Sequence, residues 1–335
     1  MIKVFDSNLT FKGFLDRFNS FQCSQKYADF GSFSIKTILT PETVNLLKEG
    51  YFIQYKDFAG IIDSIQMYDN MGEASTISAS GYDLLGLLKS RIIWKNMHFS
   101  GNSEEFLRKV VNENAINPTD TKRKIPFLTL GELSGLSQTT ERNTQHESLY
   151  QECVKVCNVA DYGFAIDLDA KAKQMKFRVY LGEDRTAGTQ NPIIIGKDFD
   201  NVLMQDYTYS TKDEITTCLV EAETTSLTIG GEYSGFKRKE TVRETTTKQE
   251  ELTSAQYQNV LKAEGMEQLN GITECFDIDT NNTSLKLGDK ITVRDKNWNL
   301  GFSARVEEKQ TAIEGGFETI TFLLGIDIYI TVVIK

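Results

Sequence analysis

Two cysteines have the spacing of a metal-binding pair, but the rest of such a site is missing. Cys153 and Cys157 stand four residues apart, so a helix would place both thiols on one face. A closed zinc site needs four ligands, and no second Cys or Cys/His pair accompanies these two in the sequence. The apolar residues at helical spacing around them predict instead that both thiols are buried.

A second candidate is an acidic segment that begins like a calcium-binding loop, Asp277-Ile278-Asp279-Thr280-Asn281. The calcium pattern then requires Gly, where this chain has Asn282. It ends with a bidentate Glu, where this chain has Gly288. Because the sharp turn and the last ligand are both missing, we assign no calcium site.

Motifs for catalysis are also missing from the sequence. Neither His98 nor His146 has a Ser or Cys nucleophile partner that the sequence identifies. Around Ser234, the glycines of a nucleophile elbow are replaced by Glu232 and Phe236. Phosphate-binding loops and dinucleotide-binding motifs are not found either. We therefore predict a protein that is not an enzyme, with no catalytic residue, cofactor or metal; the residues of its interfaces stay undetermined.

Composition narrows the class of protein. The chain has 335 residues, 40% of them hydrophobic, enough for two or three domains. Lys and Arg total 37 against 47 Asp and Glu, a net charge of −10 that argues against sequence-specific nucleic-acid binding. Five scattered cysteines argue against a disulfide framework and fit synthesis in the bacterial cytoplasm. We find no signal peptide or apolar run that predicts a membrane anchor.

The first part of the chain alternates between strands and short helices. Period-2 alternation predicts strands over 21–27 and 32–38, and Thr40 with Pro41 predicts the start of a helix. Similar patterns predict strands over 51–55, 60–65 and 75–80, and a helix over 81–88. We expect residues 1–97 to form a β-barrel-like domain with short helices.

The next region, residues 98–165, is predicted to be a helix-rich connection. Asn102 and Glu105 have the spacing of an N-terminal cap before an apolar helical stripe. Thr144 and Glu147 have the same spacing before the helix that carries the two cysteines.

Residues 166–335 are predicted to form a second β-rich domain, with any sharing of strands between the two domains left open. One helix is expected near 253–269, after a charged segment, 237–251, that we interpret as a solvated loop or the edge of a hairpin. Strand signals include 289–294, 302–306 and 319–324, and a last one lies at 326–334. The sequence shows no convincing tandem repeat.

Several short blocks in a particular order carry a family resemblance. They are Tyr27-x-x-Phe30-Gly31-x-Phe33-Ser34-Ile35, Leu46-Leu47-x-x-Gly50, Ala59-Gly60-Ile61-Ile62-Asp63-Ser64-Ile65, Ser80-Gly81-Tyr82-Asp83-Leu84, Leu87-Leu88-x-x-Arg91-Ile92-Ile93, 110–116, 177–186, Phe199-Asp200-Asn201-Val202, Leu287-Gly288-Asp289-Lys290-Ile291-Thr292-Val293 and Ala304-Arg305-Val306-Glu307-Glu308. This order resembles a family of siphovirus tail proteins that is similar to the baseplate hub of contractile phage tails and of phage-tail-like bacteriocins.

The resemblance implies an α+β, mainly β fold with two tube-like β-barrel domains and helical insertions. It implies a homotrimeric baseplate or tail-tip hub, located in the virion tail or a tailocin particle, that adapts a hexameric tail tube to a three-fold spike or tip. The implied partners are the tail tube or a tube-initiator protein and the spike or tip protein. The tape measure protein and baseplate wedge or distal tail proteins are further candidates.

Two other functions stay open at this point: a tail-associated cell-wall hydrolase and a host-surface binding module. The sequence also leaves open whether the tail is contractile and whether the particle is a phage or a bacteriocin. An acidic channel lining would repel DNA and let it pass, a hypothesis that depends on where the negative charges lie.

Overall fold

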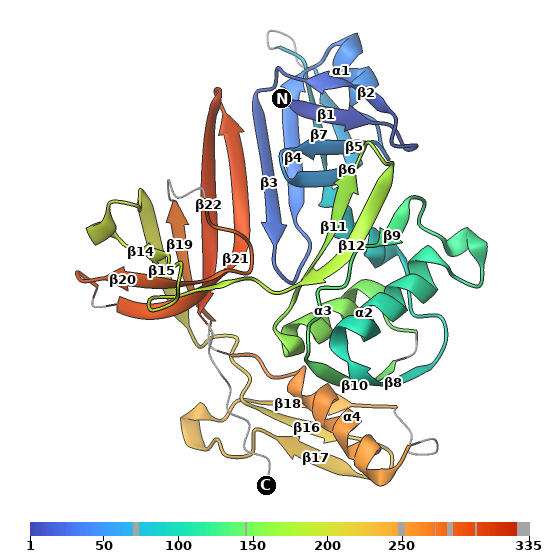
Figure 1. Ribbon diagram of the computed structural model, residues 1–335, viewed down its shortest axis with the longest axis vertical. Helices are drawn as coiled ribbons and strands as arrows, with labels where there is room; N and C mark the ends of the chain where they lie inside the picture. The colour runs from blue at the N-terminus through green and yellow to red at the C-terminus, as the bar shows by residue number, and fades with distance from the viewer. Residues whose placement is uncertain are drawn as a thin grey trace.

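The computed structural model describes residues 1–69, 74–144, 146–246, 252–271, 273–279, 284–298 and 300–326. The fold is mainly β with helices, as predicted (Figure 1). Its largest sheet has the strand order β15-β19-β22-β21-β3-β4-β7-β6-β5-β1-β2. Over the described residues this order has two free ends, so the sheet is open.

The first half of this sheet is a two-layered unit. Its long strands are β3 (Ser20–Lys26), β4 (Ser32–Ile38), β7 (Thr76–Asp83) and β6 (Phe58–Tyr68). Behind them lie β5 (Phe52–Tyr55), β1 (Ile2–Phe5), β2 (Phe11–Leu15) and the helix α1 (Pro41–Leu46). Buried side chains from both layers, including Phe21, Ile35 and Ile53, form one core. Strict alternation in β4 turns Phe33 and Ile35 inward, which is why the sequence pattern located this strand correctly.

The second half repeats this plan with different residues. Its long strands are β15 (Met204–Ser210), β19 (Thr273–Asp279), β22 (Phe317–Ile326) and β21 (Leu300–Glu314). Behind them lie β20 (Lys290–Asp295), β13 (Asp184–Arg185) and β14 (Ile194–Ile195). A separate core, including Ile195, Val293 and Leu324, fills the space between the two layers.

The correspondence extends to an irregularity in the strands. β6 first pairs with the outer strand β5, passes a β-bulge between Ile62 and Ser64, and then continues beside β7. β21 first pairs with the outer strand β20, passes a bulge between Val306 and Glu308, and continues beside β22. A bulge bends a strand, so each bulge turns its strand from the outer layer into the long-strand layer. The topology therefore contains an internal repeat that the sequence does not show.

The helix-rich region packs around its own core. It contains the strands β8 (Met97–Asn102), β10 (Thr139–Thr144), β9 (Leu128–Leu130), β11 (Gly163–Asp169) and β12 (Gln174–Tyr180). Its helices are α2 (Ser103–Val111), α3 (Leu149–Ala160), η1 (Leu84–Ser90), η2 (Asn112–Ile116) and η3 (Thr121–Arg123). The sheet β11-β12-β9 and helices α2 and α3 share one apolar cluster.

Helix starts were predicted well in two places and wrongly in a third. Thr40 caps α1 and Asn102 caps α2, as expected. The predicted cap at Thr144 is wrong, because that residue ends β10 and pairs with Met97 of β8. The cap of α3 is Ser148, whose side chain accepts a hydrogen bond from the Gln151 amide.

A third small unit is inserted between β15 and β19. It consists of β16 (Thr217–Glu221), β17 (Ser226–Ile229), η5 (Gly235–Lys237), β18 (Glu240–Glu244) and α4 (Ser254–Met266). The chain enters and leaves through Ile215 and Asn270, whose backbones exchange hydrogen bonds of 2.7 and 3.1 Å. The predicted helix near 253–269 is confirmed. The segment interpreted as a solvated loop or hairpin edge contains β18, which lies at the edge of the sheet β17-β16-β18. Residues 247–251 and the predicted strand residues 327–334 lie outside the described residues.

Candidate assembly surface

The two halves of the large sheet are joined by direct pairing of β21 with β3. The register runs from Glu308 opposite Lys26 to Glu314 opposite Ser20, in antiparallel direction. Side chains reinforce it, since the Gln22 amide donates to the Glu314 carboxylate at 3.1 Å. We call this contact the internal joint.

The turn between β5 and β6 braces the internal joint from the core side. Lys56 Nζ lies 2.6 Å from the Glu318 carboxylate on β22, which also accepts a hydrogen bond from the Tyr55 hydroxyl at 3.2 Å. Asp57, in the same turn, pairs with Lys309 on β21 at 2.9 Å. The two halves are thus held by backbone pairing and by ion pairs across the joint.

A second set of contacts fixes the helix-rich region against both halves. The Tyr27 hydroxyl, just after β3, donates to the Asp161 carbonyl at 3.1 Å. The Asp161 carboxylate in turn binds the Arg305 guanidinium of β21 and, at 3.4 Å, Lys290 of β20. Burial raises the pKa of Tyr27 to about 12, so its hydroxyl stays protonated and continues to donate. A Cβ at Gly163 or Gly288 would overlap the Tyr27 ring, and these contacts therefore need glycine.

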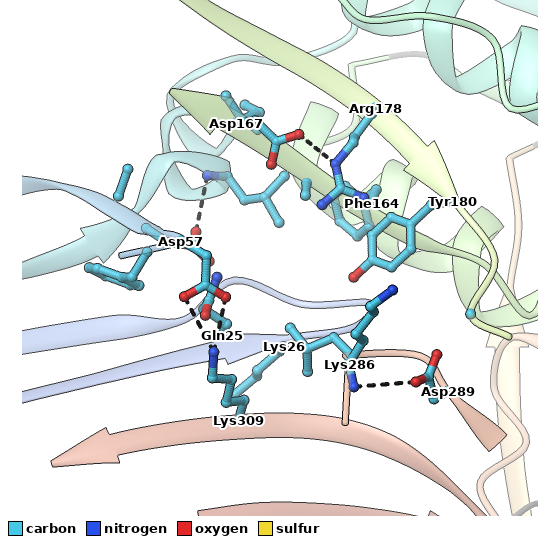
Figure 2. A pocket seen from close by; sticks show the side chains of 18 of the residues that line it. Gln25, Lys26, Asp57, Phe164, Asp167, Arg178, Tyr180, Lys286, Asp289 and Lys309 are labelled. Carbon is cyan, nitrogen blue, oxygen red and sulfur yellow. Dashed lines mark hydrogen bonds and ion pairs between the residues drawn. The ribbon is translucent and has the colours of Figure 1, made fainter. Parts of the chain in front are cut away.

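Beside these contacts lies a cavity of about 350 Å³ between β3, β12, β21 and the loop before β20 (Figure 2). Two of its acidic side chains form ion pairs: Asp57 with Lys309, and Asp167 with Arg178 at 2.5 Å (Figure 2). Asp289 accepts hydrogen bonds from the backbone amides of Glu183 and Lys286. Carboxylates held in this way connect elements of the fold, which distinguishes them from a free acid/base pair.

One carboxyl group at the cavity has an altered pKa. Burial raises the pKa of Asp83 to about 7, opposed by hydrogen bonds from the backbone amides of Gly31 and Leu85. The side chain caps η1 and fixes the connection between β3 and β4. Because its carboxylate accepts hydrogen bonds from two backbone amides, Asp83 has a structural role.

The candidate metal-binding residues of the sequence form no metal site in the part of the chain that the structure describes. Cys153 and Cys157 are fully buried on α3, and burial raises the pKa of both thiols. Asp277 and Asp279 lie in β19, and residues 280–283 are outside the described residues. Among the side chains that the structure describes, no group of three or more His, Cys, Asp or Glu is placed to hold a metal ion. No described helix has the length and apolar character of a membrane span.

The long strands of the sheet offer two edges for contact with other chains, apart from the end of the strand order at β2. At one end β15 pairs with β19 on one side, and the strand order of the described residues ends there. Beyond its bulge, β6 pairs with β7, while β5 contacts β6 over its first residues, 58–61. Residues 64–68 of β6 thus present a second edge. Exposed apolar side chains lie on both edges, Met67 on β6 and Met204 and Tyr209 on β15.

The edge formed by β15 was not apparent from the sequence. The strand β15 was not predicted, although Tyr207 and Tyr209 alternate with Asp206 and Thr208 in a strand-like pattern. The strand predicted over 60–65 is β6, which continues to Tyr68. No local signal indicates that a strand lies at an edge, because that property depends on its neighbours.

Comparison with known proteins supports the predicted family. The family model described as Siphovirus ReqiPepy6 Gp37-like protein matches residues 1–325. Comparison with curated protein sequences gives no match.

Solved structures share the fold at low identity. A tail protein from Neisseria meningitidis MC58 aligns with a TM-score of 0.60 and 14% identity, covering 97% of this chain and 96% of that one. Prophage tail protein gp18 from Listeria monocytogenes EGD-e aligns with a TM-score of 0.57 and 12% identity, covering 97% and 94%. The E. coli c3393 protein aligns with a TM-score of 0.51 and 11% identity, covering 98% and 78%. It is described as a component of the type VI secretion system with similarity to T4 tail proteins gp27 and gp5.

Proposed function

The chain belongs to the family of Siphovirus ReqiPepy6 Gp37-like proteins and is a structural phage tail protein, and we propose that it forms the trimeric hub that joins a hexameric tail tube to a three-fold spike or tip. It has no enzymatic role in this proposal, and its neighbours in the particle are the tube or tube-initiator protein and the spike or tip protein.

The internal repeat of the large sheet carries this proposal. Each chain supplies two equivalent four-stranded segments: β3-β4-β7-β6 and β15-β19-β22-β21. We call the eight strands together the wall. Three chains therefore supply six equivalent wall segments, which is the number needed to continue a six-fold tube. The segments differ in residues, so the same ring keeps three-fold symmetry toward a spike.

The wall has one polar face suited to line a channel. Opposite the apolar cores, its side chains are mostly hydroxyl and amide groups: Ser24, Ser34, Gln66, Ser78, Gln310, Thr319 and Thr321. Charged groups on the same face include Lys26 and Lys36 against Asp206, Glu308 and Glu314. Such a lining offers DNA few cations to bind, so a polyanion passes without sticking. Over the side chains that the structure describes, the channel of this proposal is polar, with slightly more acidic than basic groups.

The two rims of the wall differ, which gives the ring a direction. At one rim β21 and β22 meet in a hairpin (Figure 1). Apolar side chains at strand ends are exposed on this rim: Phe317 (81% exposed), the first residue of β22, and Ile38, the last residue of β4. At the other rim the chain carries the helix-rich region and the unit 216–269 (Figure 1). The hairpin rim exposes apolar side chains that suit stacking on a tube ring, so in this proposal it faces the tail tube, and the opposite rim faces the spike or tip.

Electron microscopy of particles from the producing bacterium, labelled with antibody to this chain, tests the proposal. We expect label at one end of the tail, where the tube meets the tip. Particles without label, or with label along the whole tube, would contradict the hub function. Muralytic activity of the purified chain on cell-wall fragments would support a hydrolase instead.

A further inference from the structure

The directions of the wall strands decide how two copies can be joined. Each strand from β15 to β6 is antiparallel to its neighbour in the wall, through seven successive pairings. With eight strands in alternation, β6 runs opposite to β15. A copy placed edge to edge with the next copy would therefore continue the antiparallel pattern without interruption.

The internal joint provides a pattern for this contact. It joins the part of β21 beyond its bulge to β3, the first long strand of the other half. The corresponding parts are residues 64–68 of β6, which also follow a bulge, and β15, the first long strand of its half. When the backbone partners are followed from strand to strand in each half, Ser64 of β6 corresponds to Glu308 of β21, and Ser210 of β15 corresponds to Lys26 of β3.

We propose that β6 of one copy pairs with β15 of the next copy in the register of the internal joint. This sets Ser64 opposite Ser210 of the partner subunit, and Gln66 opposite Thr208 of the partner subunit. Tyr68 then lies opposite Asp206 of the partner subunit. The inference rests on the proposed function and assigns its subunit interface. Three copies of eight strands each close a ring with three internal joints and three such contacts.

The side chains on the two edges fit this register on both faces. Met67 and Ile65 lie on the core side of β6, on the same face as buried Ile77. In the proposed register they meet Tyr207 and Tyr209 of the partner subunit. Met67 is 54% exposed and Tyr209 57% exposed in the single chain, so the contact removes apolar surface from water. On the channel side the facing groups are hydroxyls, an amide and a carboxylate, which form hydrogen bonds.

A brace comparable to that of the internal joint is also available. There, the turn between outer strand β5 and β6 supplies Lys56 and Asp57 to the neighbouring half. The corresponding turn lies between β20 and β21 and carries Trp298, which is 43% exposed. In the assembled ring this turn extends toward Ile65 of the neighbouring copy. An indole on an apolar strand surface is an effective anchor for such a contact.

Cysteine pairs in assembled tails test the register. Two matched pairs place cysteines at facing positions, Ser64→Cys with Ser210→Cys and Tyr68→Cys with Asp206→Cys. Two swapped pairs reuse the same four substitutions, Ser64→Cys with Asp206→Cys and Tyr68→Cys with Ser210→Cys. In a swapped pair the partners are displaced by four residues, about 13 Å along the strand, beyond the reach of a disulfide. All variants carry Cys275→Ser, because Cys275 lies on β19, beside β15, where it is the backbone partner of Thr208 and could compete for an introduced cysteine.

Tails are purified, oxidised and analysed by non-reducing electrophoresis, with linked peptides identified by mass spectrometry. We expect covalent trimers from both matched pairs and loss of these species in both swapped pairs. Within one chain the two edges are separated by seven strand spacings of about 4.8 Å each, so the disulfides form between copies. Cross-linking by the swapped pairs, or none by the matched pairs in tails that contain the chain, would overturn the register.

The number of copies in each tail tip, measured by cryo-electron microscopy, separates this result from the proposed function. Three copies without matched cross-links would reject the register and leave the trimeric hub in place. A different copy number, or absence from the tip, would reject the hub itself.

Discussion

The two halves of the wall have the same strand plan but are supported differently. Behind the first half lie three strands and α1, which enclose a core rich in Phe and Ile. The outer layer of the second half has one long strand, β20, and two strands of two residues each. Pairing within the wall, rather than a particular outer layer, is therefore what the two halves have in common.

The connections between corresponding strands differ even more. β3 is joined to β4 by residues 27–31, whereas the equivalent strands β15 and β19 are separated by the whole unit 216–269. A buried carboxyl, Asp83, holds the first connection through the Gly31 amide at 2.8 Å. Ion pairs hold the second: Arg142 of β10 binds Glu152 of α3 and Glu267, which follows α4. Each anchor can be broken separately.

The largest effect on the free energy of unfolding is expected at Arg142, the anchor of the second connection. In Arg142→Met, Glu152 and Glu267 lose their buried partner, and both carboxylates are almost completely enclosed. A buried ion pair that loses one member typically costs about 3–5 kcal/mol. We expect a decrease of this size in the free energy of unfolding, measured with denaturant. Arg243→Met is the matched control, because the Arg243 side chain is 37% exposed and lies 3.9 Å from Glu264. A decrease as large in the control would show that charge removal from the unit, rather than burial, is responsible.

The contribution of Asp83, the anchor of the first connection, to the free energy of unfolding should depend on pH. The folded pKa of Asp83 is about 7, above the ordinary aspartate pKa of 3.8, so between these values the folded state keeps a proton that the unfolded state has lost. The free energy of unfolding should therefore fall as pH rises from 4 to 7, by as much as about 4 kcal/mol at 1.36 kcal/mol per pKa unit. Asp83→Asn should flatten this slope, measured by denaturant titration at several pH values. An unchanged slope in the variant would assign the pH dependence to other groups.

A smaller effect is expected where the two halves differ in packing. A Cβ added at Gly81 of β7 would lie 1.9 Å from the Ile61 carbonyl oxygen, while Leu324 occupies the equivalent position in the second half. Gly81→Ala should lower the free energy of unfolding by about 1–3 kcal/mol through overpacking. Gly301→Ala in β21 is the control, since a Cβ there has nothing within 4 Å. Equal thermal unfolding of the two variants would contradict a packing requirement at Gly81.

The smallest effect is expected at the ion pairs that brace the internal joint. Glu318→Gln removes the partner of Lys56, whose side chain is half exposed. Exposed pairs contribute about 0–1 kcal/mol, and salt screens them further. We expect a loss in this range that shrinks at high salt, measured by denaturant unfolding. A loss of several kcal/mol would show that the brace, and not strand pairing, holds the two halves together.

Much of the local structure could be predicted from the sequence. Thr40 and Asn102 marked helix starts, because a side-chain oxygen at that position satisfies backbone amides within the next turn. Alternation located β3 and β4, since both have one buried face. Thr144 was misassigned because the same residue type also serves in a strand, and the pairing with Met97 decided between the two uses.

By itself, the sequence determined where strands such as β3, β4 and β7 lie, where α1 and α2 begin, and which family the chain resembles. Only the tertiary structure decided that two unlike segments share one strand plan and that β21 pairs with β3, nearly 300 residues away in sequence. It also decided which strands are left at the edges. The physical reason is that backbone pairing uses the same N–H and C=O groups in every residue, so local composition does not specify the partner strand.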